Sequence, residues 1–240
     1  MKILISPSKT MDFSNIEPQI TDYEPFNKLT TELRNNLKKL EVESLIKLYK
    51  SSDKIAKDAL VLNHESRTFK AITLFNGAVF KNINFATLKS EEQMYIESCV
   101  YIFSAMYGLV PAYGPISPYR LDLNNVLEPD FINLTKRWKE PINTWLQQEE
   151  SNLIIDLAST EYRKLIDPKK YPNYYRIDFK DKKDDTYKIV GTYAKMARGQ
   201  FVRAMSQNKV KTLTDIIKLS IMDYEYNSEL SSKNHLIFTR

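Results

Sequence analysis

The stretch Gly191-Thr-Tyr-Ala-Lys-Met-Ala-Arg-Gly-Gln-Phe-Val-Arg203 holds the strongest structural signal in the chain. Small and apolar residues recur in it at helical spacing, so the pattern predicts a helix from Thr192 with one apolar face. Lys195 flanks that face and Arg198 falls within it. Because a buried, unpaired guanidinium is energetically costly, Arg198 needs an anionic partner, either a protein carboxylate or a bound ligand such as phosphate.

Composition sets limits on the class of protein. The chain has 240 residues, of which 42% are hydrophobic and 27% charged, ordinary values for a globular protein with a substantial core. The net charge of +5 is compatible with nucleic-acid binding, but Lys-rich proteins often reach it without that function. Cys99 is the single cysteine, which excludes an internal disulfide, and no segment has the apolar length of a signal peptide or a membrane span. We expect a soluble, cytoplasmic protein.

Hydrophobic periodicity predicts a mixture of helices and strands. Helices are predicted over residues 25–40, 42–50, 53–62, 91–98, 134–148 and 214–219, and from Thr192 onward. Strands are predicted over residues 2–5, 71–75, 153–157 and 235–239, the last at a sheet edge, and residues 175–179 and 187–190 form a hairpin. Residues 100–104 fit a strand or the end of a helix, residues 107–118 are loop-like, and Pro141 should kink or divide its helix. The irregular spacing favours an α+β fold in a single compact domain, residues 1–240, over a regular βαβ array.

Two basic residues lie where a loop or a helix begins. Ser6 and Lys9, in the loop after the first strand, match the Ser-x-x-Lys spacing of some acyl-transfer enzymes, and Lys9 near backbone amides also suits a phosphate. An ordinary surface turn explains the same spacing. Lys54 lies in the first turn of a predicted helix, where backbone amides favour phosphate. The alternative there is a helix that Ser52 and Asp53 cap, with Lys54 in solvent.

Two further segments combine aromatic, basic and acidic residues. Arg120 offers a planar fork for phosphate or carboxylate, and Tyr119 beside it could stack on a base. Arg120 could instead pair with a nearby carboxylate and only pin its loop. Asp156 and Glu161 follow a buried strand, at the strand end where open sheets commonly bind ligands. They could act as acid–base groups or as internal counter-ions for Arg120 and Arg198, and the sequence leaves both alternatives open.

Motifs for metals and nucleotides do not occur in the sequence. His64 and His235 are far apart, Cys99 has no close partner, and no paired His or Cys motif is present. The glycine-rich nucleotide fingerprints are also missing. We therefore expect no metal site and no cofactor.

Seven segments, taken in order, resemble one protein family. They are Ile5-Ser-Pro-Ser-Lys-Thr10, Ser52-Asp-Lys-Ile-Ala56, Phe75-Asn-Gly-Ala-Val-Phe80, Ser104-Ala-Met-Tyr-Gly108, Pro118-Tyr-Arg-Leu-Asp122, Leu157-Ala-Ser-Thr-Glu-Tyr162 and Tyr193-Ala-Lys-Met-Ala-Arg-Gly199. The ordered set is similar to the YaaA family of bacterial peroxide-stress proteins, from residue 1 to about Tyr224.

This resemblance implies a compact α+β domain with a positively charged cleft, binding to DNA, and a role in limiting peroxide and iron damage. It also implies a helix-hairpin-helix-like element near residues 40–62, although no glycine precedes Gly77 to form the usual hairpin. The cations that match the family's motifs, and that would line or support the cleft, are Lys9, Lys54, Arg120, Lys195 and Arg198.

Some positions beside these motifs depart from the family's pattern. Asn76, Ala78 and Phe80 stand where the family usually has a cation, a carboxylate and a hydroxyl, and Val110-Pro-Ala112 lacks the family's usual arginine. These substitutions make the expected cleft less cationic.

Our leading hypothesis is a DNA-binding protein of the oxidative-stress response, favoured as a monomer, that contacts phosphate largely without sequence preference. Lys195 is expected to touch phosphate directly, Arg198 to organise the cleft through Asp156 or Glu161, and Gly199 to allow close backbone approach. An enzyme acting on a nucleotide or nucleic acid, with Asp156 and Glu161 as acid–base groups, is the alternative, although the resemblance implies no established reaction. A direct iron buffer is a third hypothesis, which the missing His and Cys ligands argue against.

Overall fold

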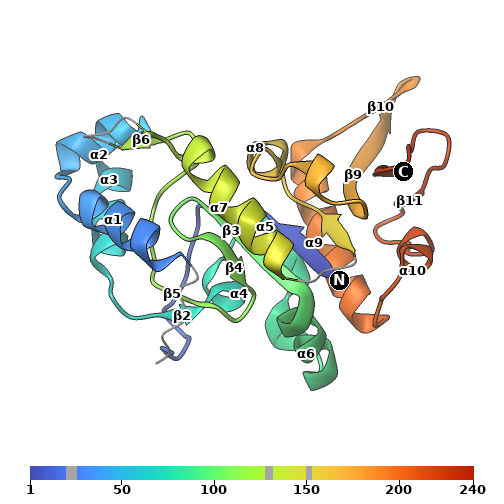
Figure 1. Ribbon diagram of the computed structural model, residues 1–240, viewed down its shortest axis with the longest axis horizontal. Helices are drawn as coiled ribbons and strands as arrows, with labels where there is room; N and C mark the ends of the chain where they lie inside the picture. Colours follow the sequence, from blue (N-terminus) through green and yellow to red (C-terminus); the bar gives the residue numbers. More distant parts are fainter. Residues whose placement is uncertain (20–25, 128–131, 150–152) are drawn as a thin grey trace.

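The first strand lies at the centre of the main sheet (Figure 1). In the computed structural model, which describes residues 1–19, 26–127, 132–149 and 153–240, β1 (Lys2–Ile5) has a parallel neighbour on each side. Ile3, Leu4 and Ile5 are fully buried, as expected for a strand inside a parallel sheet. The prediction of a short buried strand at residues 2–5 is confirmed.

The main sheet runs in the order β11, β12, β9, β8, β1, β3, β4, and β10 pairs with β9 as a side branch. Strands β3, β1, β8, β9 and β12 are parallel, with Leu4 of β1 opposite Tyr101 and Asp156, whereas β4, β10 and β11 add antiparallel pairs. The bounds are β3 (Val100–Ser104), β4 (Gly108–Pro111), β8 (Ile154–Asp156), β9 (Tyr174–Lys183), β10 (Thr186–Lys188), β11 (Glu225–Tyr226) and β12 (His235–Thr239). Two small antiparallel sheets join β2 (Phe69–Lys70) to β5 (Pro115–Ile116) and β6 (Val126–Leu127) to β7 (Ile132–Asn133).

Helices surround this sheet, with α1, α2 and α3 gathered at one end of the molecule and α10 at the other (Figure 1). Each long helix buries an apolar face, as Leu33 and Leu37 of α1 illustrate at the i, i+4 spacing. The bounds are α1 (Asn27–Lys38), α2 (Val42–Tyr49), α3 (Asp53–His64), α4 (Ala71–Leu74), α5 (Ala78–Ile83), η1 (Phe85–Thr87), α6 (Ser90–Cys99), α7 (Leu134–Gln148), α8 (Thr160–Arg163), η2 (Pro168–Lys170), α9 (Gly191–Gln207) and α10 (Leu213–Ile217). The mixed α+β class is therefore confirmed, with a larger parallel sheet than the irregular spacing suggests.

Several local predictions are wrong for identifiable reasons. Residues 71–74 form helix α4, because a short apolar run has no periodicity that separates strand from helix. The segment 107–118 contains β4 and β5 and is not simply a loop. Pro141 does not divide α7, which continues from Leu134 to Gln148. Residues 235–239 form a strand as predicted, but β11 covers its outer side, so it is not at the sheet edge.

A close helix contact fixes the position of α9. Ala197, Phe201 and Met205 are buried as the apolar periodicity predicts, and α9 packs against α5 at Gly199. A Cβ atom on Gly199 would lie 2.2 Å from the carbonyl oxygen of Val79. The close approach expected at Gly199 is therefore toward α5, and it holds the middle of α9 against that helix.

Helices α2 and α3 form a hairpin within the range predicted for a helix-hairpin-helix-like element. Lys50 closes the turn in the left-handed conformation, with φ 48° and ψ 49°, where a glycine would be expected. The backbone N–H of Ser51 donates to the carbonyl of Ile46, which satisfies one carbonyl at the end of α2. A lysine thus replaces the glycine that the sequence lacks.

None of the helices in the described ranges combines the length and the apolar character needed to cross a membrane.

Candidate functional site

The carboxyl ends of β1 and β8 border a pocket. The two strands are neighbours, but the chain leaves β1 toward β3 on one side and leaves β8 toward β9 on the other. In open α/β sheets, this change of direction leaves a crevice at the strand ends, where ligands commonly bind. The loop Ser6–Thr10 follows β1 and the segment Ser159–Tyr162 follows β8, and both line the pocket.

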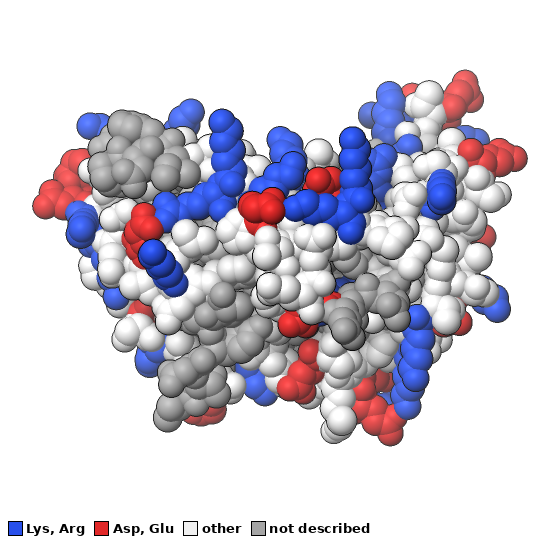
Figure 2. Space-filling model, in the orientation of Figure 1, with Lys and Arg blue, Asp and Glu red and all other residues white. Residues whose placement is uncertain are grey.

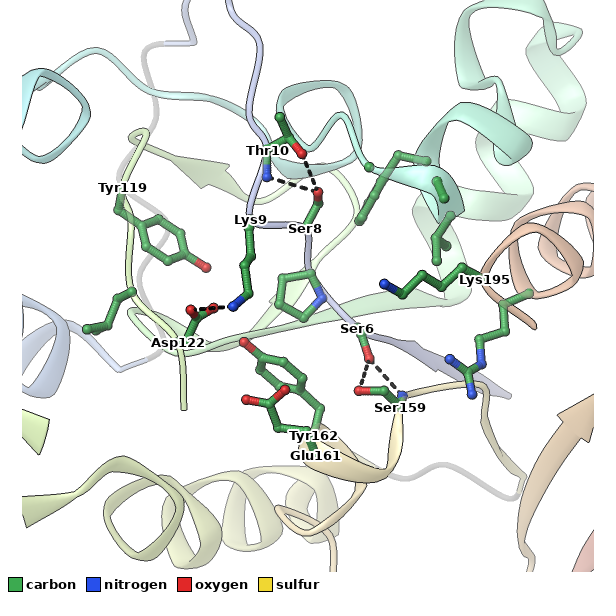
Figure 3. A pocket seen from close by; sticks show the side chains of 17 residues that line it. Ser6, Ser8, Lys9, Thr10, Tyr119, Asp122, Ser159, Glu161, Tyr162 and Lys195 are labelled. Carbon is green, nitrogen blue, oxygen red and sulfur yellow. Dashed lines mark hydrogen bonds and ion pairs between the residues drawn. The ribbon is translucent and has the colours of Figure 1, made fainter. Parts of the chain in front are cut away.

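The pocket has a volume of about 350 Å³ and draws its walls from five separate segments of the chain (Figure 3). Such a volume lies at the lower end of the range for small-ligand sites, roughly 300–1,000 Å³. The lining residues are Ser6–Thr10, Gly77–Phe80, Tyr119, Leu121, Asp122, Ser159, Glu161, Tyr162, Lys195 and Arg198.

Hydroxyl groups join the loops that follow the two central strands. The backbone N–H of Ser159 donates to Ser6 Oγ at 2.8 Å, and the two Oγ atoms lie 3.2 Å apart. Ser8 packs against Gly77, where a Cβ atom would lie 2.3 Å from Ser8 Oγ. These contacts hold the β1 loop against its neighbours, so the pocket floor is built before any ligand arrives.

Acidic groups gather at one end of the pocket. Lys9 Nζ lies 2.8 Å from Asp122 Oδ2, although the lysine side chain remains 66% exposed. Asn124 Nδ2 donates to Glu161 Oε1 at 3.1 Å. Burial raises the pKa of Glu161, and the charge of Asp122 raises it further, whereas Lys9 and Lys164 act in the opposite direction. This end of the pocket therefore presents carboxylate oxygens that accept hydrogen bonds.

Basic groups of α9 occupy the other end. Lys195 is exposed, whereas Arg198 is only 8% exposed. Neither side chain forms an ion pair or a hydrogen bond with any residue of the described ranges, and the buried Nε of Arg198 lacks a partner there. Burial lowers the pKa of Arg198, as does the nearby charge of Arg163, while Asp178 acts in the opposite direction.

A buried network beneath the pocket explains why Arg198 is unpaired. Arg163 lies 3.3 Å from both Asp156 and Asp178, and it donates to the carbonyl of Ala158 at 3.0 Å. Asp178 also pairs with His235 Nε2 at 2.8 Å. Arg163 therefore pairs with Asp156, a carboxylate that was expected to pair with Arg198.

The expected internal roles of Asp156 and Glu161 need correction on this point. Asp156 is fully buried, accepts from Tyr174 and from the backbone of Ala158, and does not line the pocket. Glu161 bonds to Asn124 and makes no ion pair with Arg120 or Arg198 in the described residues. Sequence reasoning missed Arg163. Its position seven residues after Asp156, just beyond the end of the buried strand, was the one feature of the sequence that could have indicated this pairing.

The other predicted phosphate contacts are only partly brought together. Lys9, Lys195 and Arg198 line the pocket, whereas Lys54 is exposed on α3 outside its lining. The guanidinium of Arg120 instead lies over the ring of Tyr49, 5.6 Å from its centroid, and pairs with neither Asp122 nor Asp156 in the described residues.

Tyr119 lines the pocket but is only 3% exposed. Its hydroxyl lies 2.7 Å from Ser104 Oγ, and its ring packs edge-on against Phe75 and Tyr107. No ring face is open to a base, so the stacking role expected from the sequence does not fit this geometry.

No group of three or more His, Cys, Asp or Glu side chains within the described residues is arranged to hold a metal ion. The functional groups of the pocket are thus hydroxyls, the carboxylates of Asp122 and Glu161, and the unpaired cations of Lys195 and Arg198.

These features define a mixed α/β protein with a small pocket, lined by both charged and apolar residues, at the carboxyl ends of its central parallel strands. Comparison with known proteins then identifies the family: residues 1–230 match the model of the family described as peroxide stress protein YaaA, and the chain belongs to that family. It is 33% identical over 254 aligned residues to a UPF0246 protein of Francisella philomiragia, and 34% identical over 257 residues to a UPF0246 protein of Francisella tularensis subsp. novicida. Both alignments cover 100% of this chain and of the relative.

Proposed function

We propose that this protein binds DNA through the phosphate backbone and acts in the response to peroxide. One observation carries the proposal: α9 brings the exposed Lys195 to the pocket, and this cation has no carboxylate partner in the described residues. Unpaired cations at a surface opening attract polyanions, and phosphate contacts supply most of the affinity of sequence-independent DNA binding. Membership of the peroxide stress family supports the biological setting.

The α2–α3 hairpin extends the proposed binding surface. The hydroxyl of Tyr49 at the end of α2 donates to the carbonyl of Arg120, and the N–H of Arg120 donates to Asn63 of α3 at 2.9 Å. Leu121 and Asp122, which follow directly, belong to the pocket wall. The hairpin and the pocket are therefore joined through one short segment, and DNA that lies on one is near the other.

Exposed cations along this surface would position the duplex. Figure 2 shows Lys and Arg side chains along the upper edge of the molecule, with Asp and Glu side chains among them, and this edge is hollowed between its two ends. We assign the backbone contacts to the exposed lysines among the predicted residues, which are Lys9, Lys54 and Lys195. Arg198 lies deeper and has a separate role, developed below.

Fluorescence anisotropy with a labelled duplex of arbitrary sequence tests this proposal. Three phosphate contacts give a salt slope of about −2.7, so the affinity should fall about 40-fold between about 50 mM and about 200 mM salt. Lys195→Ala should reduce that slope by about one. The matched control is Lys218→Ala, an exposed lysine at the end of α10 outside the pocket lining. An affinity that stays flat with salt, or that Lys195→Ala leaves unchanged, excludes the proposal.

DNA binding would limit iron-dependent damage by covering the duplex where it would otherwise react. Purified protein should then slow the nicking of supercoiled DNA by ferrous iron and peroxide. Lys195→Ala should protect less than Lys218→Ala at equal concentration. Equal protection by both variants would instead indicate that the protein consumes iron or peroxide in solution.

The enzymatic alternative retains one of its two acid–base groups. Glu161 lines the pocket and has a raised pKa, mainly through burial, which suits a proton donor. Asp156 is committed to Arg163 beneath the pocket and cannot reach a substrate there. Asp122 is the other carboxylate of the lining, but it pairs with Lys9 at 2.8 Å, so DNA binding remains the function that the site supports best.

A further inference from the structure

The pocket is bipolar. Figure 3 shows Lys195 at one side and Asp122 and Glu161 across from it, with Ser6 and Ser159 between them. Arg198 belongs to the lining and to the same helix as Lys195, one turn further along. The apolar part of the lining is supplied by Pro7, Val79, Phe80, Leu121 and the rings of Tyr119 and Tyr162. A ligand that matches this lining is anionic at the end near Lys195, has an apolar part, and carries hydrogen-bond donors at the other end, where Lys9 pairs with Asp122.

The cationic end is not a solvated surface patch. Arg198 is more than nine-tenths buried, it lines the pocket, and its Nε has no partner within the described residues. The two buried carboxylates of the neighbourhood, Asp156 and Asp178, lie within ion-pair distance of Arg163 and not of Arg198. A buried guanidinium without a counter-ion is costly unless it binds an anion. The fold therefore keeps a planar, two-pronged anion receptor at the inner end of the pocket.

The end of the pocket that holds Asp122 and Glu161 determines which group the bound anion can carry. Carboxylate oxygens of Asp and Glu accept hydrogen bonds from the exocyclic amino groups of bases, as they do for the N4 amino group of cytosine. The cavity of about 350 Å³ is large enough for one small ligand but not for double-stranded DNA. Phosphomonoesters carry nearly two negative charges at neutral pH, which suits a lysine and an arginine acting together.

We infer that the pocket binds a single nucleoside monophosphate unit, with its phosphate on Arg198 and Lys195 and its base directed toward Asp122 and Glu161. The inference builds on the proposed DNA binding, because the phosphorylated end of a DNA strand and a free mononucleotide present the same chemical group. Lys195 belongs to both sites, whereas Arg198 serves only the pocket.

Isothermal titration calorimetry with deoxycytidine monophosphate tests the inference. Deoxycytidine monophosphate should bind at least about tenfold more tightly than inorganic phosphate, which lacks the base, and than deoxycytidine, which lacks the charge. Thymidine monophosphate, which has no exocyclic amino group, should bind more weakly than deoxycytidine monophosphate. Absence of saturable binding by deoxycytidine monophosphate overturns the inference, and so does equal binding of inorganic phosphate.

Substitutions locate the phosphate. Arg198→Met should weaken binding of deoxycytidine monophosphate by at least about 30-fold, since it removes a buried charged partner. Arg198→Lys should lose less, because it keeps the charge without the fork. Lys218→Ala should match the wild type. Circular dichroism checks that each variant is folded, and if Arg198→Met is not, the exposed Lys195→Ala should still weaken nucleotide binding. Unchanged affinity in a folded Arg198 variant, or in Lys195→Ala, overturns the assignment.

Competition experiments show whether the ligand is a DNA end or a free nucleotide. They also distinguish failure of the pocket inference from failure of the proposed DNA binding. If a duplex with a 5′-phosphate displaces deoxycytidine monophosphate and the same duplex with a 5′-hydroxyl does not, the pocket reads DNA ends; if neither does, the ligand is a free nucleotide. If closed circular DNA binds while no nucleotide or phosphorylated end does, the pocket inference fails and DNA binding stands. If nucleotides bind while no form of DNA does, the proposed DNA binding fails and the pocket inference stands.

Discussion

Replacing Arg198 with methionine should make the protein more stable while it removes the anion receptor. Arg198 is only 8% exposed, and its Nε is buried without a hydrogen-bond partner among the described residues. Methionine keeps most of the apolar length of arginine and fills irregular space without a charge. The substitution therefore removes an uncompensated buried cation and leaves little cavity.

The expected gain follows from the groups around Arg198. An unsatisfied buried donor costs about 1–3 kcal/mol, and the charge of Arg163 adds repulsion. Attraction to Asp178 and Asp156 offsets part of that cost. We expect the free energy of unfolding to rise by about 1–2 kcal/mol, which corresponds to about 2–8 °C in Tm for a chain of this length.

Urea unfolding and differential scanning calorimetry in phosphate-free buffer measure this change. The paired variant Arg163→Met should behave in the opposite way and lose about 3–5 kcal/mol, because it leaves the buried Asp156 without its cation and Asp178 with His235 alone. Replacing Arg198 should therefore raise the free energy of unfolding, whereas replacing the neighbouring Arg163 should lower it. A loss of stability in Arg198→Met comparable to that of Arg163→Met would show that Arg198 is neutralised within the protein, and the argument for a bound anion would fall.

Three other changes test separate parts of the fold. Gly199→Ala should cost about 1–3 kcal/mol or more in thermal unfolding, because its Cβ would lie 2.2 Å from the carbonyl oxygen of Val79, and a neutral effect would contradict the close helix contact. Lys50→Gly should raise the unfolding free energy by about 0.5–1 kcal/mol in urea, since φ is 48° there, and a loss would mean that the lysine side chain matters more than the backbone. Hydrogen bonds from Arg67 lower the pKa of Glu65 from 4.5 to about 2, so this group stabilises the folded state above about pH 4.5 and loses that effect as the pH falls toward 2. Glu65→Gln should accordingly cost up to about 1 kcal/mol near neutral pH, with a difference from the wild type that shrinks on acidification; a difference independent of pH would exclude the ion pair as its cause.

Elements with a clear period or a clear boundary were predictable from the sequence. The apolar spacing of residues 192–205 correctly predicts α9 and the burial of Arg198, and the apolar runs at residues 2–5 and 153–157 correctly predict the central strands. Residues 71–75 were not predictable in this way, because four apolar positions fit a helical turn as well as a strand. Hydrophobic periodicity also does not predict the order of the strands in the sheet. β12 is internal only because β11 pairs with its outer side, and β11 is a strand of two residues that has no clear sequence pattern.

The candidate site was predictable as a set of loops but not as a set of contacts. The segments after β1 and β8 and the start of α9 do converge on one pocket. Pairing depends on side-chain direction, however, and Arg163 takes Asp156 although Arg120 and Arg198 were the expected partners. Lys54 lies in the first turn of a helix, as predicted, but that helix belongs to the hairpin and does not line the pocket.

The central place of β1 has a consequence for how the chain is made. β1 precedes both of its parallel partners in the chain, and β3 and β8 begin only at Val100 and Ile154. At about 5–20 residues per second, the ribosome needs about 8–30 s to supply the second partner. During that time the apolar segment Ile3–Ile5 has two unpaired edges, which makes it a natural target for a chaperone or for mispairing with another nascent chain. We expect slow or chaperone-assisted biogenesis, with the pocket assembled only after the last parallel strands have joined the sheet.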